Sequence, residues 1–169
     1  MPVLLAPTVA LHDSWLEART EWSDDEYPHG SGLRPEYDVD SPAGFAAWID
    51  SLHRRNDYDV PATYWWIVED DVYLGAIALR HTLTPPLLQV GGHIGYNVRP
   101  SARNRGLATW ALGAVLDEAR AMGLSRVLIT CKTSNLASAR VIEHRSGVLE
   151  DTRITDEGLT YRYWVELKG

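Results

Sequence analysis

A short basic loop between an apolar strand and an apolar helix is the feature that most limits how this chain can fold. Residues 98–109 read Val-Arg-Pro-Ser-Ala-Arg-Asn-Arg-Gly-Leu-Ala-Thr, so three arginines and a glycine come just before the helix. The first N–H groups of a helix have no intrahelical partner and carry a partial positive charge, which favours a bound anion. Gly106 lacks a Cβ, so its backbone can adopt a positive φ or approach a ligand closely. The loop therefore predicts a phosphate site at a strand-to-helix turn.

The sequence of this loop resembles the GCN5-related N-acetyltransferase (GNAT) family. Residues 103–108 fit that family's pattern of Gln or Arg, two residues, Gly, one residue, and Gly or Ala. Segment 93–98 is similar to the family's fourth strand and segment 126–131 to its fifth, and Asn135-x-x-Ser138 is similar to the start of its next helix. A six-residue pattern alone is weak, but its position among these elements makes the resemblance specific.

The resemblance implies which residues bind acetyl-CoA, the family's co-substrate. In the family the loop binds the pyrophosphate, the preceding strand lies beside pantetheine, and the Asn and Ser motif lies near both. Carried over position by position, the implied cofactor-binding residues are Asn97, Val98, Arg103, Asn104, Arg105, Gly106, Leu107, Ala108, Thr109, Asn135 and Ser138. Three alternatives stay open: the loop is an exposed basic turn, the strand side chains belong to the core, and the motif caps a helix.

His93 is the candidate catalytic base. Its strand position matches one where relatives often carry a Glu or His that relays a proton from the amine, usually through water. Imidazole suits this role because its ordinary pKa lies near neutral pH. A structural hydrogen-bonding role for His93 stays open. Many relatives also place a tyrosine seven residues after the Asn to protonate the departing thiolate, but this chain has Ile142, so the general acid is unassigned.

The N-terminal third is acidic and contains a long polar loop. Residues 12–71 hold fifteen Asp or Glu against four Arg, within a chain whose net charge is −7. If this part forms the acceptor side, it attracts a cationic amine; the alternative is that its acids are solvated helix faces and loops. Because loops often carry binding residues, the acceptor-contact candidates are Tyr27, His29, Glu36 and Tyr37.

Hydrophobic periodicity predicts a single α/β domain over residues 1–169. The resemblance implies a GNAT-like mixed β-sheet that is flanked by helices and splayed between the strands near 93–98 and 126–131. Helices are expected near residues 11–22, 41–52, 107–122 and 135–145. Strands are expected near residues 63–68, 72–79, 91–98, 126–131, 148–154 and 159–167. Pro85 and Pro86 are expected only to break the chain after the second strand.

Composition narrows the environment and partners. The absence of a membrane-length apolar run or signal peptide predicts a soluble, cytoplasmic protein without a membrane partner. The single Cys131 excludes an internal disulfide, and no metal-ligand spacing occurs, so no metal is expected. The negative net charge disfavours nucleic acid as a partner, while a homodimer is left open.

The sequence therefore predicts an N-acetyltransferase that moves an acetyl group from acetyl-CoA directly to an amine. The acceptor is a small-molecule amine or a protein or peptide amine, and the sequence does not distinguish them. A non-catalytic acyl-CoA-binding module is the alternative, favoured by the missing tyrosine. A nucleotide-binding domain is a weaker alternative, because neither common glycine-rich nucleotide motif is present.

Overall fold

The computed structural model describes residues 1–54, 56–57 and 60–167. The first part of the chain contains β1 (Val3–Leu5), α1 (His12–Arg19), α2 (Pro42–His53), β2 (Asn56–Asp57), β3 (Val60–Glu69) and β4 (Val72–Arg80). The second part contains α3 (Pro85–Gln89), β5 (Ile94–Val98), α4 (Leu107–Ala121), β6 (Arg126–Lys132), α5 (Leu136–His144), β7 (Val148–Thr155) and β8 (Gly158–Glu166). Single 3-10 turns at Val9–Leu11 and Pro100–Ala102 precede α1 and follow β5.

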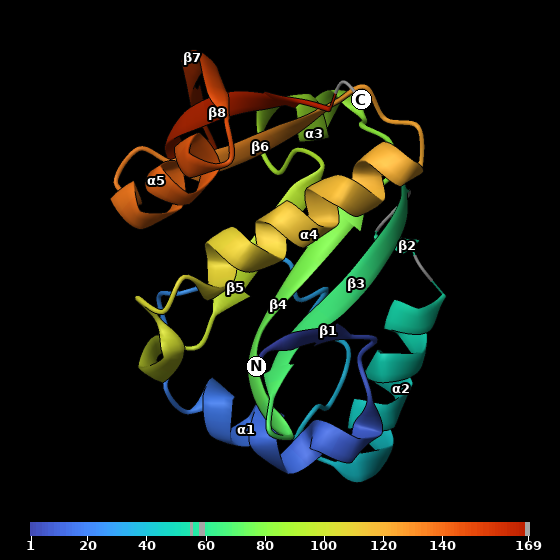
Figure 1. The fold of residues 1–169 in the computed structure, drawn as a ribbon. Coiled ribbons are helices and arrows are strands. Elements are labelled where there is room, and N and C mark those ends of the chain that lie inside the picture. The colour runs from blue at the N-terminus through green and yellow to red at the C-terminus, as the bar shows by residue number, and fades with distance from the viewer. Residues whose placement is uncertain (55, 58–59, 168–169) are drawn as a thin grey trace.

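The strands form two sheets, and every pairing within them is antiparallel. The first sheet has the order β1-β3-β4-β5, with β2 paired to β3, and the second has the order β6-β8-β7. Figure 1 shows α4 crossing between them, in yellow and orange, with the second sheet and α5 on one side. The fold is therefore α/β with helices against the sheets, as predicted from the sequence, with its strands divided between two sheets.

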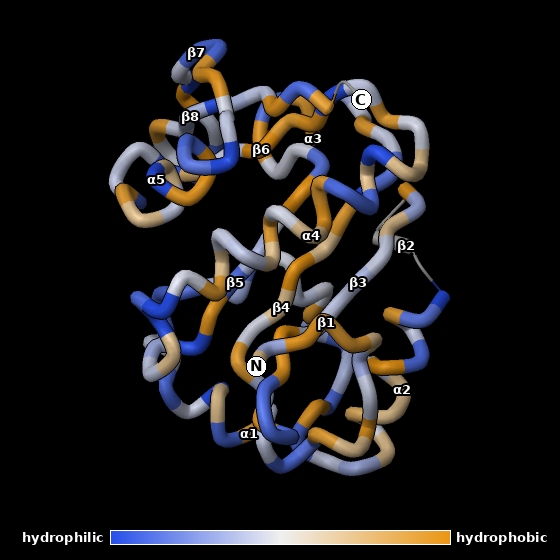
Figure 2. The backbone as a smooth tube through the Cα atoms, viewed as in Figure 1, coloured by the Kyte–Doolittle hydropathy of each residue, from blue (hydrophilic) through white to orange (hydrophobic). Residues whose placement is uncertain are grey.

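Alternating side chains of β3 and β4 supply two hydrophobic cores, one on each face of the first sheet. Trp66 and Ala76 belong to the core that contains α1 and α2, whereas Ile67 and Ile77 belong to the core that contains α4. This period of two is what a strand buried on both faces requires. In Figure 2 the hydrophobic colour runs along much of β4, while hydrophilic residues gather in the loop between β5 and α4.

The two sheets meet at His93, just before β5. Its backbone N–H donates to the Leu128 carbonyl over 2.8 Å, and the Leu128 N–H donates to its ring Nδ1 over 2.9 Å. Beyond this point β5 pairs with β4 and β6 pairs with β8, so no ladder joins β5 to β6 in the described chain. The opening between these strands lies where the sequence predicted the splay.

A few elements differ from the predictions. β5 begins at Ile94 rather than at Gly91, because Gly91 and Gly92 have φ of +103° and +60° and turn the chain. A Cβ on Gly92 would lie 2.4 Å from the Leu128 carbonyl oxygen, so only glycine fits this close approach. Pro85 stands in the first turn of α3, where its missing N–H costs nothing, so the expected break is a short helix.

Candidate functional site

The start of α4 presents its backbone N–H groups to open space. Gly106 is the N-cap residue in the left-handed region, with φ +76° and ψ 10°, and no described side chain caps the helix. A Cβ built on Gly106 meets nothing within 4 Å. Leu107, Ala108 and Thr109 form the first turn, and their N–H groups lack intrahelical acceptors. This geometry matches the anion site that the loop sequence predicts. Asn104, where many relatives have glycine, also adopts a positive φ, of +64°.

An ion pair with Glu21, in the turn just after α1, holds the loop in place. Arg99 is only 4% exposed, and its Nε and Nη2 donate to Glu21 Oε1 over 3.1 and 2.5 Å. The Ser101 N–H donates to Glu21 Oε2 over 2.9 Å. The hydrogen bond from Arg99 is the main reason that the pKa of Glu21 falls to about 2. The carboxylate of Glu21 therefore stays charged near neutral pH and ties the loop to the end of α1.

Arg103 and Arg105, which the resemblance places among the cofactor-binding residues, already have partners. Arg103 donates from Nε to the Val98 carbonyl and from Nη2 to Glu26, each over 3.1 Å. Arg105 Nη2 donates to Glu69 over 2.5 Å. These bonds are the main reason that the pKa values of both carboxyl groups are lowered. The arginines brace the loop, which leaves the backbone N–H groups of α4 as its open anion donors.

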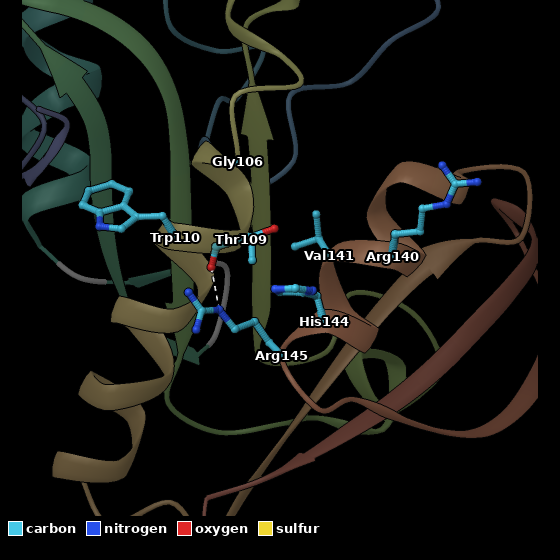
Figure 3. A pocket seen from close by; sticks show the side chains of 7 residues that line it. All are labelled: Gly106, Thr109, Trp110, Arg140, Val141, His144 and Arg145. Atoms are coloured by element: carbon cyan, nitrogen blue, oxygen red, sulfur yellow. Dashed lines mark hydrogen bonds between the residues drawn. The ribbon is translucent and has the colours of Figure 1, made fainter.

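A cavity of about 420 Å³ lies beside the start of α4, between that helix and α5. Figure 3 shows its lining residues, which are Gly106, Thr109, Trp110, Arg140, Val141, His144 and Arg145. Three of these are basic and none is acidic. Its volume falls within the range of small-molecule sites. The cavity therefore extends the anion site from the helix start towards a basic wall.

Backbone groups of β5 point into the opening between the sheets. The Arg99 N–H donates to the Leu74 carbonyl, and the His93 carbonyl accepts from the Arg80 N–H, each over 2.7 Å. Because the bonding direction alternates along an antiparallel strand, the N–H groups of Tyr96 and Val98 point away from β4, towards β6. Of the two backbone candidates from the sequence, Val98 thus faces the opening, whereas Asn97 bonds to β4.

The Tyr96 side chain crosses the opening from β5 to α5. Its hydroxyl lies 2.7 Å from Ser138 Oγ and 3.3 Å from the Ser138 carbonyl oxygen. Burial raises the pKa of Tyr96, so the hydroxyl keeps its proton. Burial also raises the pKa of the neighbouring Cys131 to about 11, which argues against a thiolate nucleophile. The sequence did not single out this hydroxyl, because Tyr96 lies among apolar residues of its strand and was compatible with a core position. Only its contact with Ser138 distinguishes it from a core side chain.

Asn135 acts as the cap of α5. Its Oδ1 accepts the Ser138 N–H over 3.1 Å, and its backbone does not adopt helical angles. This matches the helix-start alternative that the sequence left open. Its placement at the first turn of α5 also positions Ser138 opposite Tyr96.

His93 occupies a structural position at the junction of the sheets. Its Nδ1 accepts the Leu128 N–H, so the neutral ring carries its proton on Nε2 and has no free lone pair for an incoming proton. Burial, helped by Arg80, lowers the pKa of His93 to about 4. These observations favour the hydrogen-bonding alternative over the base.

The titration of His93 makes stability depend on pH. The folded pKa is about 4 and the ordinary value is 6.5, so the unfolded chain binds a proton first as the pH falls. We expect the stabilisation to be complete above pH 6.5 and to be lost between pH 6.5 and 4, by about 3 kcal/mol. Thermal unfolding across this range measures the loss. The His93→Asn variant is expected to lose this dependence, and an unchanged slope would contradict the assignment.

The first polar loop covers the other face of β5. The Asn97 side-chain amide donates to the His29 carbonyl over 2.7 Å. Gly30 has φ +77°, and a Cβ there would lie 2.2 Å from the Gly95 carbonyl oxygen, so the loop lies directly on the strand. The ring of Tyr27 meets that of His29 edge-on at 5.2 Å. These two acceptor candidates are therefore placed together, over β5.

The other two acceptor candidates, Glu36 and Tyr37, have different surroundings. Tyr37 packs against the core formed with α1 and α2, and Glu36 is exposed.

Among the described residues, no group of three His, Cys, Asp or Glu is placed to hold a metal ion. No helix in the described part of the chain combines the length and apolar character needed to cross a membrane.

The site thus combines an uncapped helix start, a cavity lined by basic side chains and a gap between two sheets. A model of the acetyltransferase (GNAT) domain matches residues 4–145, most of the chain. The chain belongs to the GNAT family of acetyl-CoA-dependent N-acetyltransferases, which confirms the resemblance identified from the loop. A comparison with curated proteins found no match.

Solved structures with the same fold include several acetyltransferases. Mycobacterium smegmatis RimJ in complex with CoA-disulfide has a TM-score of 0.75 at 18% identity, covering 98% of this chain and 81% of that one. The Salmonella typhimurium enzyme that modifies the N-terminal serine of ribosomal protein L7/L12 has a TM-score of 0.72 at 15% identity, covering 99% and 95%. The microcin C7 self-immunity acetyltransferase MccE, in complex with acetyl-CoA and AMP, has a TM-score of 0.70 at 14% identity, covering 98% and 92%.

Proposed function

We propose that this chain binds acetyl-CoA at the start of α4 and transfers the acetyl group directly to the amine of a peptide or protein. The observation that carries the proposal is the uncapped start of α4 at Gly106, where a left-handed glycine and open space expose the backbone donors. A diphosphate fits this site because it accepts several N–H bonds and complements the helix dipole.

The opening between β5 and β6 is the proposed path of the pantetheine arm. The Val98 N–H points into it and is the proposed donor to the acetyl oxygen, where negative charge develops during attack. The neutral amine attacks the carbonyl carbon, forming the C–N bond as the C–S bond breaks. The amine proton passes to water, because His93 Nδ1 is already occupied. The departing sulfur takes a proton from the Tyr96 hydroxyl, which solvent then restores.

Loss of the Tyr96 hydroxyl should slow turnover without weakening CoA binding. We expect Tyr96→Phe to lower kcat about a hundredfold, the lower end of what positioned acids contribute. The Ser138→Ala variant is the matched control, since it removes the hydrogen-bond partner but leaves the phenol in place. A Tyr96→Phe variant with the wild-type kcat, or with the same effect as Ser138→Ala, would exclude this hydroxyl as the donor.

A peptide or protein amine is the proposed acceptor. RimJ and the L7/L12-modifying enzyme share the fold, and the latter acts on a protein N-terminus. The loop over β5 carries Tyr27 and His29 on the face of the strand opposite the Tyr96 side chain. The acceptor amine is proposed to approach from that face. The acidic N-terminal third supports attraction of a cationic amine before it loses its proton.

Thiol release from acetyl-CoA tests the function. The panel contains peptides with free N-termini, the same peptides with acetylated N-termini, polyamines and small aromatic amines. We expect thiol release and acetylated product only with free peptide amines. Release with small amines alone would overturn the acceptor class. CoA binding without any thiol release would instead support the alternative of a non-catalytic acyl-CoA-binding module. That alternative is favoured by Ile142, whose side chain cannot donate a proton.

A further inference from the structure

β7 is the edge strand of the second sheet. In the order β6-β8-β7, the strand β8 pairs with one side of β7, and no described strand pairs with the other side. Figure 1 shows the hairpin of β7 and β8 projecting from the top of the molecule. A free edge presents unpaired N–H and C=O groups that can bind another strand. β7 has eight residues, so its edge is longer than that of β1, which has three.

The pairing with β8 determines which backbone groups of β7 point to the free side. The hairpin closes with the pair Thr155 and Gly158 across a two-residue turn, so these two residues exchange hydrogen bonds. Bonded and non-bonded pairs alternate along an antiparallel ladder, which leaves Thr152 and Ile154 in non-bonded pairs with β8. The N–H and C=O groups of Thr152 and Ile154 therefore point away from β8, towards the free side.

The side chains along this edge combine exposed apolar groups with charges of both signs. Ile154 is 88% exposed, and Leu149, on the same face of the sheet, is 45% exposed. Asp151 and Arg153 lie on the other face, with side chains that are 35% and 38% exposed. Edge strands that avoid pairing often carry charged side chains, especially lysine. An edge with one acid and one base two residues apart can instead attract a strand that has the same pair in reverse order.

We propose that β7 pairs antiparallel with β7 of a second copy of this chain, around a twofold axis at Thr152. The two three-stranded sheets then form one continuous sheet. Thr152 lies opposite Thr152 of the second copy, and their outward groups exchange two hydrogen bonds. The same register places Asp151 opposite Arg153 of the second copy, and this charge pair occurs twice. The dimer does not depend on the proposed function.

The order of charges on β7 selects both the partner and the register. A twofold axis at Asp151 would place two carboxylates opposite each other, and an axis at Arg153 would place two guanidinium groups opposite each other. Of the three axis positions from 151 to 153, the one at Thr152 joins opposite charges and uses outward backbone groups. The β-bulge between Leu149 and Asp151 ends the regular edge. Ile154 then lies towards the bulge of the second copy, on the face that carries Leu149.

Sedimentation velocity over a range of protein concentrations tests the interface without any ligand. We expect a species with twice the chain mass of 18.9 kDa. The dissociation constant is expected to be about 10 µM, because an edge of this length gives an interface at the small end of specific complexes. A dimer of this kind closes on itself, so larger oligomers are not expected.

The Thr152→Pro variant should raise the dissociation constant about tenfold or more. Proline removes an N–H that points to the free side and that β8 does not use, so the hairpin itself keeps its hydrogen bonds. Thr152→Val is the matched control, because it keeps the N–H and the preference for a strand. This control is expected to dimerise as the wild type does.

A second pair of variants separates edge pairing from packing through the exposed face. Ile154 and Leu159 lie opposite each other on the hairpin and are both exposed, but Leu159 belongs to β8 and lies one strand farther from the edge. We expect Ile154→Lys to weaken the dimer about tenfold, and Leu159→Lys to change it by less than about twofold. A larger effect from Leu159→Lys than from Ile154→Lys would overturn the edge pairing.

Other results would also overturn the proposal. One is a wild-type chain that stays monomeric at about ten times the expected dissociation constant. Another is a Thr152→Pro variant that dimerises as the wild type does, and a third is a wild-type chain that forms oligomers larger than a dimer. Should Thr152→Pro lose its cooperative thermal unfolding, the comparison of Ile154→Lys with Leu159→Lys decides the question.

Discussion

Replacing Gly106 with valine is expected to weaken CoA binding about a hundredfold, close to 2.7 kcal/mol. Gly106 has φ +76°, so a β-branched residue must strain or flip the backbone that aims the N–H groups of α4. Its side chain would also enter the open space in which the diphosphate is proposed to lie. The loss of one or two charge-assisted hydrogen bonds is of this size. Calorimetric titration with CoA measures the effect.

Gly123 offers a matched control at the other end of α4. It has φ +88°, and a Cβ there also meets nothing within 4 Å. The Gly123→Val variant should therefore lose similar conformational stability, about 1 to 2 kcal/mol, while it binds CoA as the wild type does. Equal CoA affinities for the two variants would mean that Gly106 matters only for backbone strain, and that outcome contradicts the proposed site.

The Glu21→Gln variant is expected to lose about 3 kcal/mol of stability, since it leaves the guanidinium of Arg99 buried with a neutral partner. For a chain of this length such a loss lowers Tm by roughly 6 to 12 °C. The pKa of Glu21 is about 2 in the folded chain against 4.5 ordinarily. Its stabilisation is thus complete above pH 4.5 and is lost as the pH falls towards 2. Thermal unfolding measures both effects.

Glu17 provides the control for Glu21. It lies one turn earlier on α1, its Oε1 is 3.8 Å from Arg99 Nη2, and its side chain is 75% exposed. Exposed pairs of this kind contribute little, so Glu17→Gln should change stability by less than about 0.5 kcal/mol. Similar losses for both variants would show that the charge of α1, rather than the buried pair, stabilises the loop. CoA affinity should also fall in Glu21→Gln, because the pair positions the loop before α4.

The parts of the site that depend on neighbouring residues could be predicted from the sequence. The strand, the loop and the helix from β5 to α4 are encoded in one continuous segment, and a glycine before an apolar helix predicts both the turn and the exposed N–H groups. The family assignment followed from the same segment and is confirmed. The splay between β5 and β6 came from the resemblance, and its physical cause at His93 appears only in the structure.

The parts that depend on long-range contacts could not be predicted. Arg103 and Arg105 looked like phosphate ligands, but they bond to Glu26 and Glu69, which lie 77 and 36 residues away in the sequence. Tyr96 looked like a core residue until the fold placed its hydroxyl against an α5 side chain 42 residues later. Sequence periodicity reports which face of an element is apolar, and it does not report which charges meet across the fold.

A crystal structure with CoA tests the central claim most directly. The account predicts diphosphate oxygens within hydrogen-bond distance of the Leu107 and Ala108 N–H groups, with the pantetheine arm between β5 and β6. Ordered CoA on another surface, with α4 making no contact to phosphate, would contradict it.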